Sequence, residues 1–158
     1  MADRSGNIWL ASFDGLLQFN TATKIFTANH FKYADTLNRR YNNLFMNLYA
    51  DPADENILWC GTWGAGLARF DGKTWRNFTT ADGLPANHIF MLYLDPQGKL
   101  WAGTNRGLAR LNDDGKSFTV MTTADGLYAD NVFSMTNAAD GSLWIGSFGG
   151  VAHLVAQQ

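Results

Sequence analysis

The side chains that most often bind metals or act as nucleophiles are few in this sequence and do not form a set. The three histidines, His30, His88 and His153, lie far apart along the chain, and Cys60 is the only cysteine. A structural zinc site needs four ligands at short characteristic spacings, and a disulfide needs two cysteines. The sequence therefore predicts no metal site, no cofactor and no internal disulfide, and it leaves the redox compartment open.

Paired carboxylates are the other common catalytic device, and glycosidases use them. Asp82 and Asp125 are candidates for such a pair, but both stand in the same string, "TTADGL", at 79–84 and again at 122–127. An aspartate in a string of this kind bonds the backbone of a turn. We therefore interpret both as turn residues and predict no catalytic residue.

The repeated string belongs to a longer internal repeat. A shift of 43 residues brings "GKLWAGTN" (98–105) onto "GSLWIGSF" (141–148), and four tryptophans, Trp9, Trp59, Trp101 and Trp144, mark four copies. Each copy reads as short alternating strands separated by Gly, Asp and Asn turns. A unit of about 42 residues with four antiparallel strands is typical of a β-propeller blade. The sequence predicts an all-β fold, a partial ring of about four blades with repeats at approximately 1–43, 44–86, 87–129 and 130–158.

The repeated tryptophans and glycines have a structural interpretation. On the second strand of a blade, a tryptophan can fill the gap to the neighbouring blade. A glycine two residues later, as at Gly61, Gly103 and Gly146, lets backbones approach closely. Met46 and Met91 follow aromatic residues at the start of the innermost strands, and we expect them to fill gaps in the core.

The string "DPQGKLWAGTNRGLARLNDDGKSFTVMTTADGLYADNVF" (95–133) resembles the two-component regulator propeller repeat. The resemblance covers nearly the whole chain. It implies a sensor β-propeller of a bacterial hybrid two-component system, located in the periplasm or outside the cell, that senses a ligand, often derived from a glycan. No kinase, response-regulator or membrane-spanning segment is visible in this sequence.

Candidate ligand-binding residues gather where the repeats differ. In a four-stranded meander, the turns between second and third strands lie on the same face of the ring as the connections between blades. One position in those turns is aromatic in the first, second and fourth copies and Asn in the third. Exposed aromatic rings are surfaces on which sugar rings stack. The candidate residues on this face are Phe13, Asp14, Trp63, Asn87, His88, Asn105, Arg106, Tyr128, Asp130 and Phe148. The alternative is that these aromatic residues only cap the tops of the blades.

The long connection after the first blade offers a further basic group. Arg39 and Arg40 could hold a carboxylate or sulfate through paired hydrogen bonds, or could be ordinary solvated arginines.

Composition limits the partners. The formal net charge of −2 does not give the basic stripe that nucleic-acid binding needs. The longest apolar run, at 89–94, is far shorter than the roughly 20 residues that span a bilayer, and the first residues show no secretory signal. We expect no nucleic-acid partner and no membrane span in this chain.

Both ends of the repeat array are incomplete. The first copy begins at a second strand and the last ends in a third strand, which gives three, four, four and three strands. Open blade edges and uncovered tryptophans favour aggregation. We therefore expect either self-association or further blades from a longer parent chain.

Three functions remain open from the sequence. The favoured one is a non-catalytic ligand-sensing module whose ligand is a small molecule or an oligosaccharide. The second is a propeller lyase or glycosidase-like enzyme, and the third is a self-assembling scaffold for protein interactions.

Overall fold

Fourteen strands in four antiparallel sheets make up the described part of this protein. The computed structural model describes residues 1–3, 5–13, 15–29, 44–51, 54 and 56–155. The sheets hold three, four, four and three strands in chain order. The helical segments found within those residues are two short 3-10 turns, η2 (Thr80–Asp82) and η3 (Thr123–Asp125). The all-β fold and the number of strands in each blade are confirmed.

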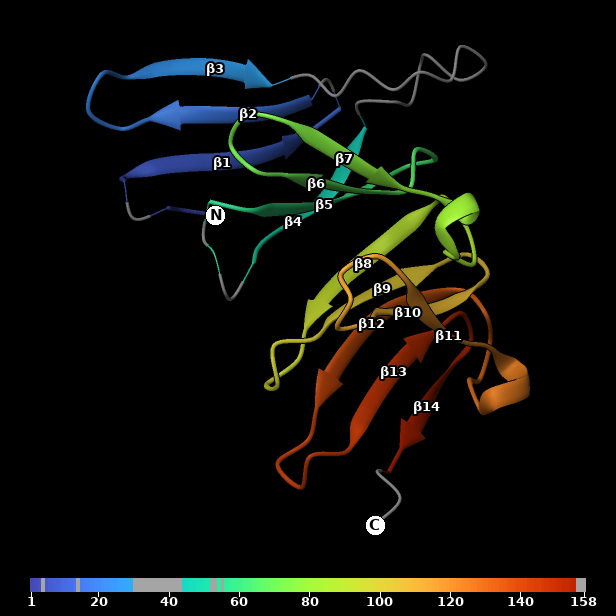
Figure 1. Ribbon diagram of the computed structural model, residues 1–158. Helices are drawn as coiled ribbons and strands as arrows, with labels where there is room; N and C mark the ends of the chain where they lie inside the picture. The colour runs from blue at the N-terminus through green and yellow to red at the C-terminus, as the bar shows by residue number, and fades with distance from the viewer. Residues whose placement is uncertain (4, 14, 30–43, 52–53, 55, 156–158) are drawn as a thin grey trace.

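Each sheet is a meander in which strands that are consecutive in the chain pair with one another. The first sheet contains β1 (Asn7–Ser12), β2 (Gly15–Asn20) and β3 (Ile25–Asn29), and the second contains β4 (Phe45–Ala50), β5 (Leu58–Thr62), β6 (Leu67–Phe70) and β7 (Trp75–Phe78). The third contains β8 (Ile89–Leu94), β9 (Leu100–Thr104), β10 (Gly107–Leu111) and β11 (Phe118–Met121), and the fourth contains β12 (Val132–Asn137), β13 (Leu143–Ser147) and β14 (Gly150–Leu154). The sheets follow one another through space in this order (Figure 1). One sheet lies within each expected repeat, and the extent of a single domain over 1–158 stays a prediction.

The repeated tryptophans lie in β1, β5, β9 and β13, and three of them are anchored by an aspartate. The indole Nε1–H of Trp59 donates to Asp51 Oδ2 (2.9 Å) and that of Trp101 donates to Asp95 Oδ2 (2.9 Å). Asp95 also accepts from two backbone N–H groups of its own turn, those of residues 97 and 99. The aspartate of the turn thus fixes the hairpin and orients the tryptophan ring at the same time.

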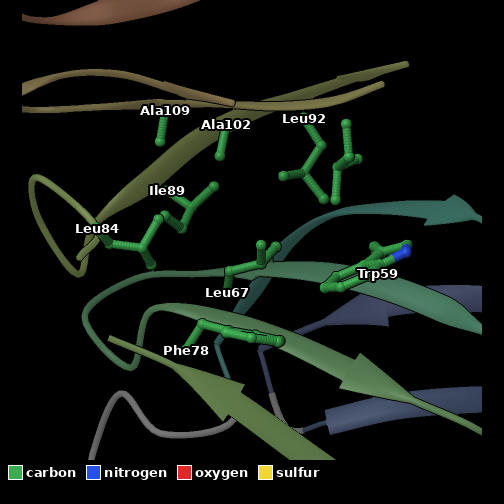
Figure 2. Packing of buried hydrophobic residues seen from close by; sticks show 9 residues of the cluster. Trp59, Leu67, Phe78, Leu84, Ile89, Leu92, Ala102 and Ala109 are labelled. Atoms are coloured by element: carbon green, nitrogen blue, oxygen red, sulfur yellow. The ribbon is translucent and has the colours of Figure 1, made fainter. Parts of the chain in front are cut away.

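Trp9, Trp59 and Trp101 fill the spaces between sheets, whereas Trp144 lies on an open face. Figure 2 shows the cluster between the second and third sheets, in which Trp59, Leu67 and Phe78 face Ile89 and Leu92. An equivalent cluster around Trp9 joins the first and second sheets, and one around Trp101 joins the third and fourth. Burial of such apolar surface stabilises a sheet stack by about 25 cal/mol per Å², so the packing between blades contributes to the stability of each.

Close packing requires the glycines that follow Trp59 and Trp101. A Cβ atom at Gly103 would lie 2.5 Å from the carbonyl oxygen of Val132 in the next sheet. At Gly61 it would lie 2.7 Å from Cγ2 of Ile89, also in the next sheet. At Gly146 the nearest atoms belong to Ser134 of the same sheet, and the first copy has Ala11 at this position.

The repeated "TTADGL" string forms the joint between blades. The backbone N–H of Thr79 donates to Asp82 Oδ2 (2.8 Å), and the Thr79 hydroxyl accepts from the N–H of Ala81 (3.2 Å). Gly83 follows with φ +96°, a conformation that favours glycine. The same capping box recurs at η3. The chain therefore leaves each complete outer strand through an identical tight turn and enters the next inner strand.

The outer faces of the first and fourth sheets are open in the described structure. Trp144 is 44% exposed, whereas Trp101 at the equivalent place is 6% exposed. On the other outer face Leu10 is 40% exposed, whereas Ala102 at the equivalent position is buried. The first sheet exposes the kind of face that other sheets pack against the preceding blade. The fourth sheet exposes the kind of face that other sheets pack against the following blade.

Candidate functional site

The turns between second and third strands lie against the connections between blades, as the sequence predicted. In the second blade, the backbone N–H groups of Gly64 and Gly66 both donate to the carbonyl oxygen of Asn87 (3.1 and 2.9 Å). In the third blade, the N–H of Gly107 donates to the carbonyl oxygen of Asp130 (2.7 Å). These bonds hold the variable residues of neighbouring blades on one face of the structure.

Five of the ten candidate residues line one pocket on this face. Trp63, Asn87, His88, Asn105 and Arg106 surround a hollow of about 480 Å³ between the second and third blades. Its volume lies in the range of small-molecule sites. The remaining lining residues are small or neutral: Gly64, Thr80, Pro85 and Ala86.

A row of aromatic rings begins in this pocket and continues across the blades. Trp63 lies edge-on to His88, with ring centroids 5.5 Å apart, and its indole is 5.6 Å from the ring of Phe90. Phe90 in turn stacks on Phe133 of the fourth blade, with centroids 4.8 Å apart and an angle of 19° between the planes. Trp63 and Phe133 are each more than one third exposed. We call the three rings of Trp63, Phe90 and Phe133 the aromatic row. They form a continuous surface on three blades.

The sequence analysis did not identify Phe90 or Phe133, and a β-bulge explains why. The register of β8 with β9 shifts between Ile89 and Met91, which leaves Phe90 outside the alternation of the strand. The same shift occurs in β12, at Phe133. A bulge turns the extra residue out of the ladder. The recurrence of large apolar residues at this one position of the inner strands was the signal that could have revealed the row.

The same bulge corrects the prediction for Met46. It occupies the bulge position of β4, between Phe45 and Asn47, and is 42% exposed, so it does not fill a core gap. Met91 follows the bulge in β8 and is buried as expected.

Two candidate residues have structural duties. The side-chain oxygen Oδ1 of Asn87 accepts from the N–H of Thr80 (3.0 Å), and Oδ1 of Asp130 accepts from the N–H of Thr123 (2.7 Å). Each therefore fastens a blade connection to the start of a 3-10 turn. Asn87 still lines the pocket, while Asp130 is not among the pocket residues.

The other candidates lie apart from the pocket. Phe13 and Phe148 are about three quarters exposed at the turns of the first and fourth blades. Tyr128 is also exposed, and its ring lies beside Gly150, where an added Cβ would be 2.6 Å from the ring. Asp14, Arg39 and Arg40 lie outside the described residues.

The charge of the pocket comes from one side chain. Among the nine lining residues, Arg106 is the only one with a permanent charge, and none is acidic. The side chain of Asn105 adds a polar atom: its Oδ1 is buried and has no hydrogen-bond partner. The pocket thus combines an aromatic wall and a cation, and one of its lining residues carries a buried, unpaired amide oxygen.

Metal or thiol chemistry has no visible centre in the described residues. No group of three or more His, Cys, Asp or Glu residues lies together within them. Burial raises the pKa of the Cys60 thiol, which favours the neutral, unreactive form.

Comparison with known proteins identifies a known repeat in one part of the chain. The family model of the two component regulator propeller matches residues 83–106, which include the blade connection, β8, β9 and the turn that carries Arg106. These residues therefore form a two-component regulator propeller repeat.

The relatives of this propeller are longer proteins. It is 29% identical over 112 residues to "Histidine kinase P4" of Formosa agariphila, a match that covers 64% of this chain and 8% of the kinase. The extracellular domain of the hybrid two component system BT3049 from B. thetaiotaomicron superposes with a TM-score of 0.70 at 22% identity, over 98% of this chain and 20% of that domain. The chain therefore spans one fifth or less of the length of these relatives.

The propeller fold is shared with an enzyme as well. The structure of streptogramin B lyase matches 97% of this chain and 52% of its own, with a TM-score of 0.63 at 14% identity. This likeness shows the fold alone.

In the described residues, no helix of this propeller is long and apolar enough to cross a membrane.

Proposed function

We propose that this chain is a non-catalytic ligand-sensing module of a bacterial two-component regulator, and that it binds a glycan-derived ligand at the pocket and along the aromatic row. The observation that carries this proposal is the row of three rings beside a pocket with polar atoms. Exposed aromatic planes offer apolar area for stacking on a flat ligand, and the polar groups give it orientation.

The geometry favours an oligosaccharide over a single sugar. Trp63, Phe90 and Phe133 lie on three successive blades, and neighbouring ring centroids are 5.6 and 4.8 Å apart. Such a row is longer than one ring, so an extended chain can contact more of it than a single sugar can. The row is held by inner strands and by backbone bonds between blades, so little ordering of the site is needed on binding.

Signal output needs other parts of a regulator. The relatives that this chain matches include a histidine kinase and the extracellular domain of a hybrid two component system. By this likeness, we assign the module to the periplasm or the cell exterior, with the ligand signal passed to partner domains.

The open outer faces also need a partner. Trp144 and Val151 are exposed on the fourth sheet, and Ile8 and Leu10 on the first. Because their equivalents form the internal interfaces, further propeller sheets, from a second copy or from a longer chain, are the natural cover for these faces.

The test is a thermal-shift screen with a broad panel of oligosaccharides. A ligand that binds only the folded state raises the melting temperature by mass action. We expect at least one oligosaccharide to do so, and we expect Trp63→Ala and Phe133→Ala to reduce the shift. Phe148→Ala, which removes an aromatic ring that is 75% exposed and lies outside the row, is the matched control and should leave the shift unchanged. The proposal fails if no member of the panel raises the melting temperature, or if Trp63→Ala leaves a genuine shift intact.

A further inference from the structure

Arg106 differs from the other described arginines. Arg69, Arg76 and Arg110 each lie over an aromatic ring, with the guanidinium carbon 5.9, 4.4 and 5.5 Å from the ring centroid. No side-chain hydrogen bond, ion pair or ring contact joins Arg106 to any described residue. Its backbone N–H alone is engaged, with the Thr104 hydroxyl (3.0 Å).

The turn itself does not require an arginine at this place. The equivalent residue of the fourth blade is Gly149, and the β9–β10 turn places its positive φ at Gly107, not at Arg106. The conformation of the turn therefore does not require arginine at position 106. The Arg106 side chain lies at the wall of the pocket.

Arg106 is exposed, and no acidic side chain of the described residues pairs with it. No acidic residue lines the pocket. Nearby Asp130 directs Oδ1 to the N–H of Thr123 (2.7 Å), and Asp82 accepts from the N–H of Thr79 (2.8 Å). An exposed guanidinium without a protein partner is suited to an oxyanion, which it binds through two parallel hydrogen bonds.

One further group of the pocket suits a sugar. The indole of Trp63 is 37% exposed and lines the same hollow as Arg106, so it offers a surface for stacking. A neutral sugar could accept hydrogen bonds from the Arg106 guanidinium through its hydroxyl oxygens, but it would bring no counter-charge.

From this arrangement we propose that the ligand is an acidic saccharide, and that Arg106 binds its carboxylate or sulfate group. The inference rests on the proposed function, since it names the chemical class of the ligand for the same site. Carboxylate and sulfate can each accept two parallel hydrogen bonds from a guanidinium, and the experiment separates them.

The test compares probes that differ in one charged group. Trigalacturonic acid is titrated beside its methyl ester, and a sulfated galactan tetrasaccharide beside its desulfated form, with binding measured by calorimetry. We expect one acidic probe to bind at least about tenfold more tightly than its neutral counterpart, which is the size of one charge-assisted hydrogen-bonded pair. We also expect this preference to weaken as sodium chloride is raised.

Variants assign the preference to Arg106. Arg106→Gln should reduce the affinity for the acidic probe to that of the neutral one, and Arg106→Lys should restore part of it. Lys73→Gln, which removes one positive charge from an exposed turn of a different hairpin, is the matched control and should retain the preference. An unchanged melting temperature of the free variants shows that each still folds.

Each outcome has one meaning. Equal binding of acidic and neutral probes, with no effect of Arg106→Gln, would overturn the inference and leave the proposed function standing. A preference for acidic probes that survives in Arg106→Gln would overturn it as well. If no probe of either kind binds while another oligosaccharide of the panel raises the melting temperature, the inference fails and the proposed function stands; if the panel gives no shift either, both fail.

Discussion

The paired substitutions Trp101→Ala and Trp144→Ala test the interpretation of the blade interfaces. Both residues occupy the same position of the repeat, but Trp101 is 6% exposed and Trp144 is 44% exposed. Trp101 also donates to Asp95, whereas the residue at the equivalent place before Trp144 is Ala138. The two changes remove the same atoms from a closed and from an open interface.

The expected magnitudes follow from this difference. Replacement of a fully buried tryptophan by alanine costs roughly 3–5 kcal/mol of unfolding free energy. At position 101 the loss of the indole bond to Asp95 adds to this, although Asp95 keeps its backbone partners. At position 144 about half of the burial is already absent, and the indole stacks only on His153 (4.2 Å between centroids), so we expect roughly 1–2 kcal/mol.

The assay is urea unfolding followed by tryptophan fluorescence and circular dichroism, at a concentration at which light scattering gives the mass of one chain. We expect Trp101→Ala to lose about 3 kcal/mol more than Trp144→Ala, which corresponds to a melting temperature lower by roughly 6–12 °C. Equal losses in the monomer would refute the view that each tryptophan stabilises the chain by filling the gap to the following blade.

Three further predictions concern the turns and the outer faces. Gly66→Ala should destabilise the protein far more than Gly72→Ala, as measured by the urea midpoint. Both glycines have positive φ, but a Cβ at Gly66 would lie 2.1 Å from a backbone oxygen of the neighbouring strand, whereas the site at Gly72 is open. Backbone and side-chain hydrogen bonds from their turns hold the pKa of Asp71 and of Asp114 at about 2, below the usual 3.8. Their contribution to stability is therefore present above about pH 4 and is lost as the pH falls toward 2. The double Asn variant should reduce the fall of stability between these pH values, and an unchanged fall would contradict this. If the outer faces pair, wild-type protein should have a mass above that of one chain in light scattering, and Leu10→Glu should return it to one chain; a wild type that stays monomeric at high concentration would contradict that pairing.

The fold was predictable because its signals are local and repeated. A tryptophan in each copy, a turn aspartate six residues before Trp101 and a glycine two residues after it together specify a strand, its hairpin and its packing partner. The strands, the turns and the packing of Trp59 and Trp101 appear in the structure as expected, whereas Trp144 is exposed and the first copy has Ala11 in place of the glycine. Repetition made the signal reliable, since one ambiguous strand is resolved by its equivalents.

The site was predictable only in part, for a physical reason. Trp63, His88 and Arg106 were found because they stand in turns, where differences between repeats are visible in the sequence. Phe90 and Phe133 were missed because they lie inside strands, and a simple alternation assigns such residues to one face of a sheet or the other. A bulge breaks that alternation without changing the residue types. The capping role of Asp130 was hidden because its partner, the N–H of Thr123, is a backbone group.

The central claim is that the face with the pocket and the aromatic row binds the ligand, and hydrogen exchange tests it most directly. Amide exchange is measured by mass spectrometry with and without the tightest-binding oligosaccharide of the panel. We predict slower exchange in residues 63–66, 86–90 and 104–107. Protection confined to the hairpin turns at 71–75 and 113–118, or no protection at all, would contradict the account.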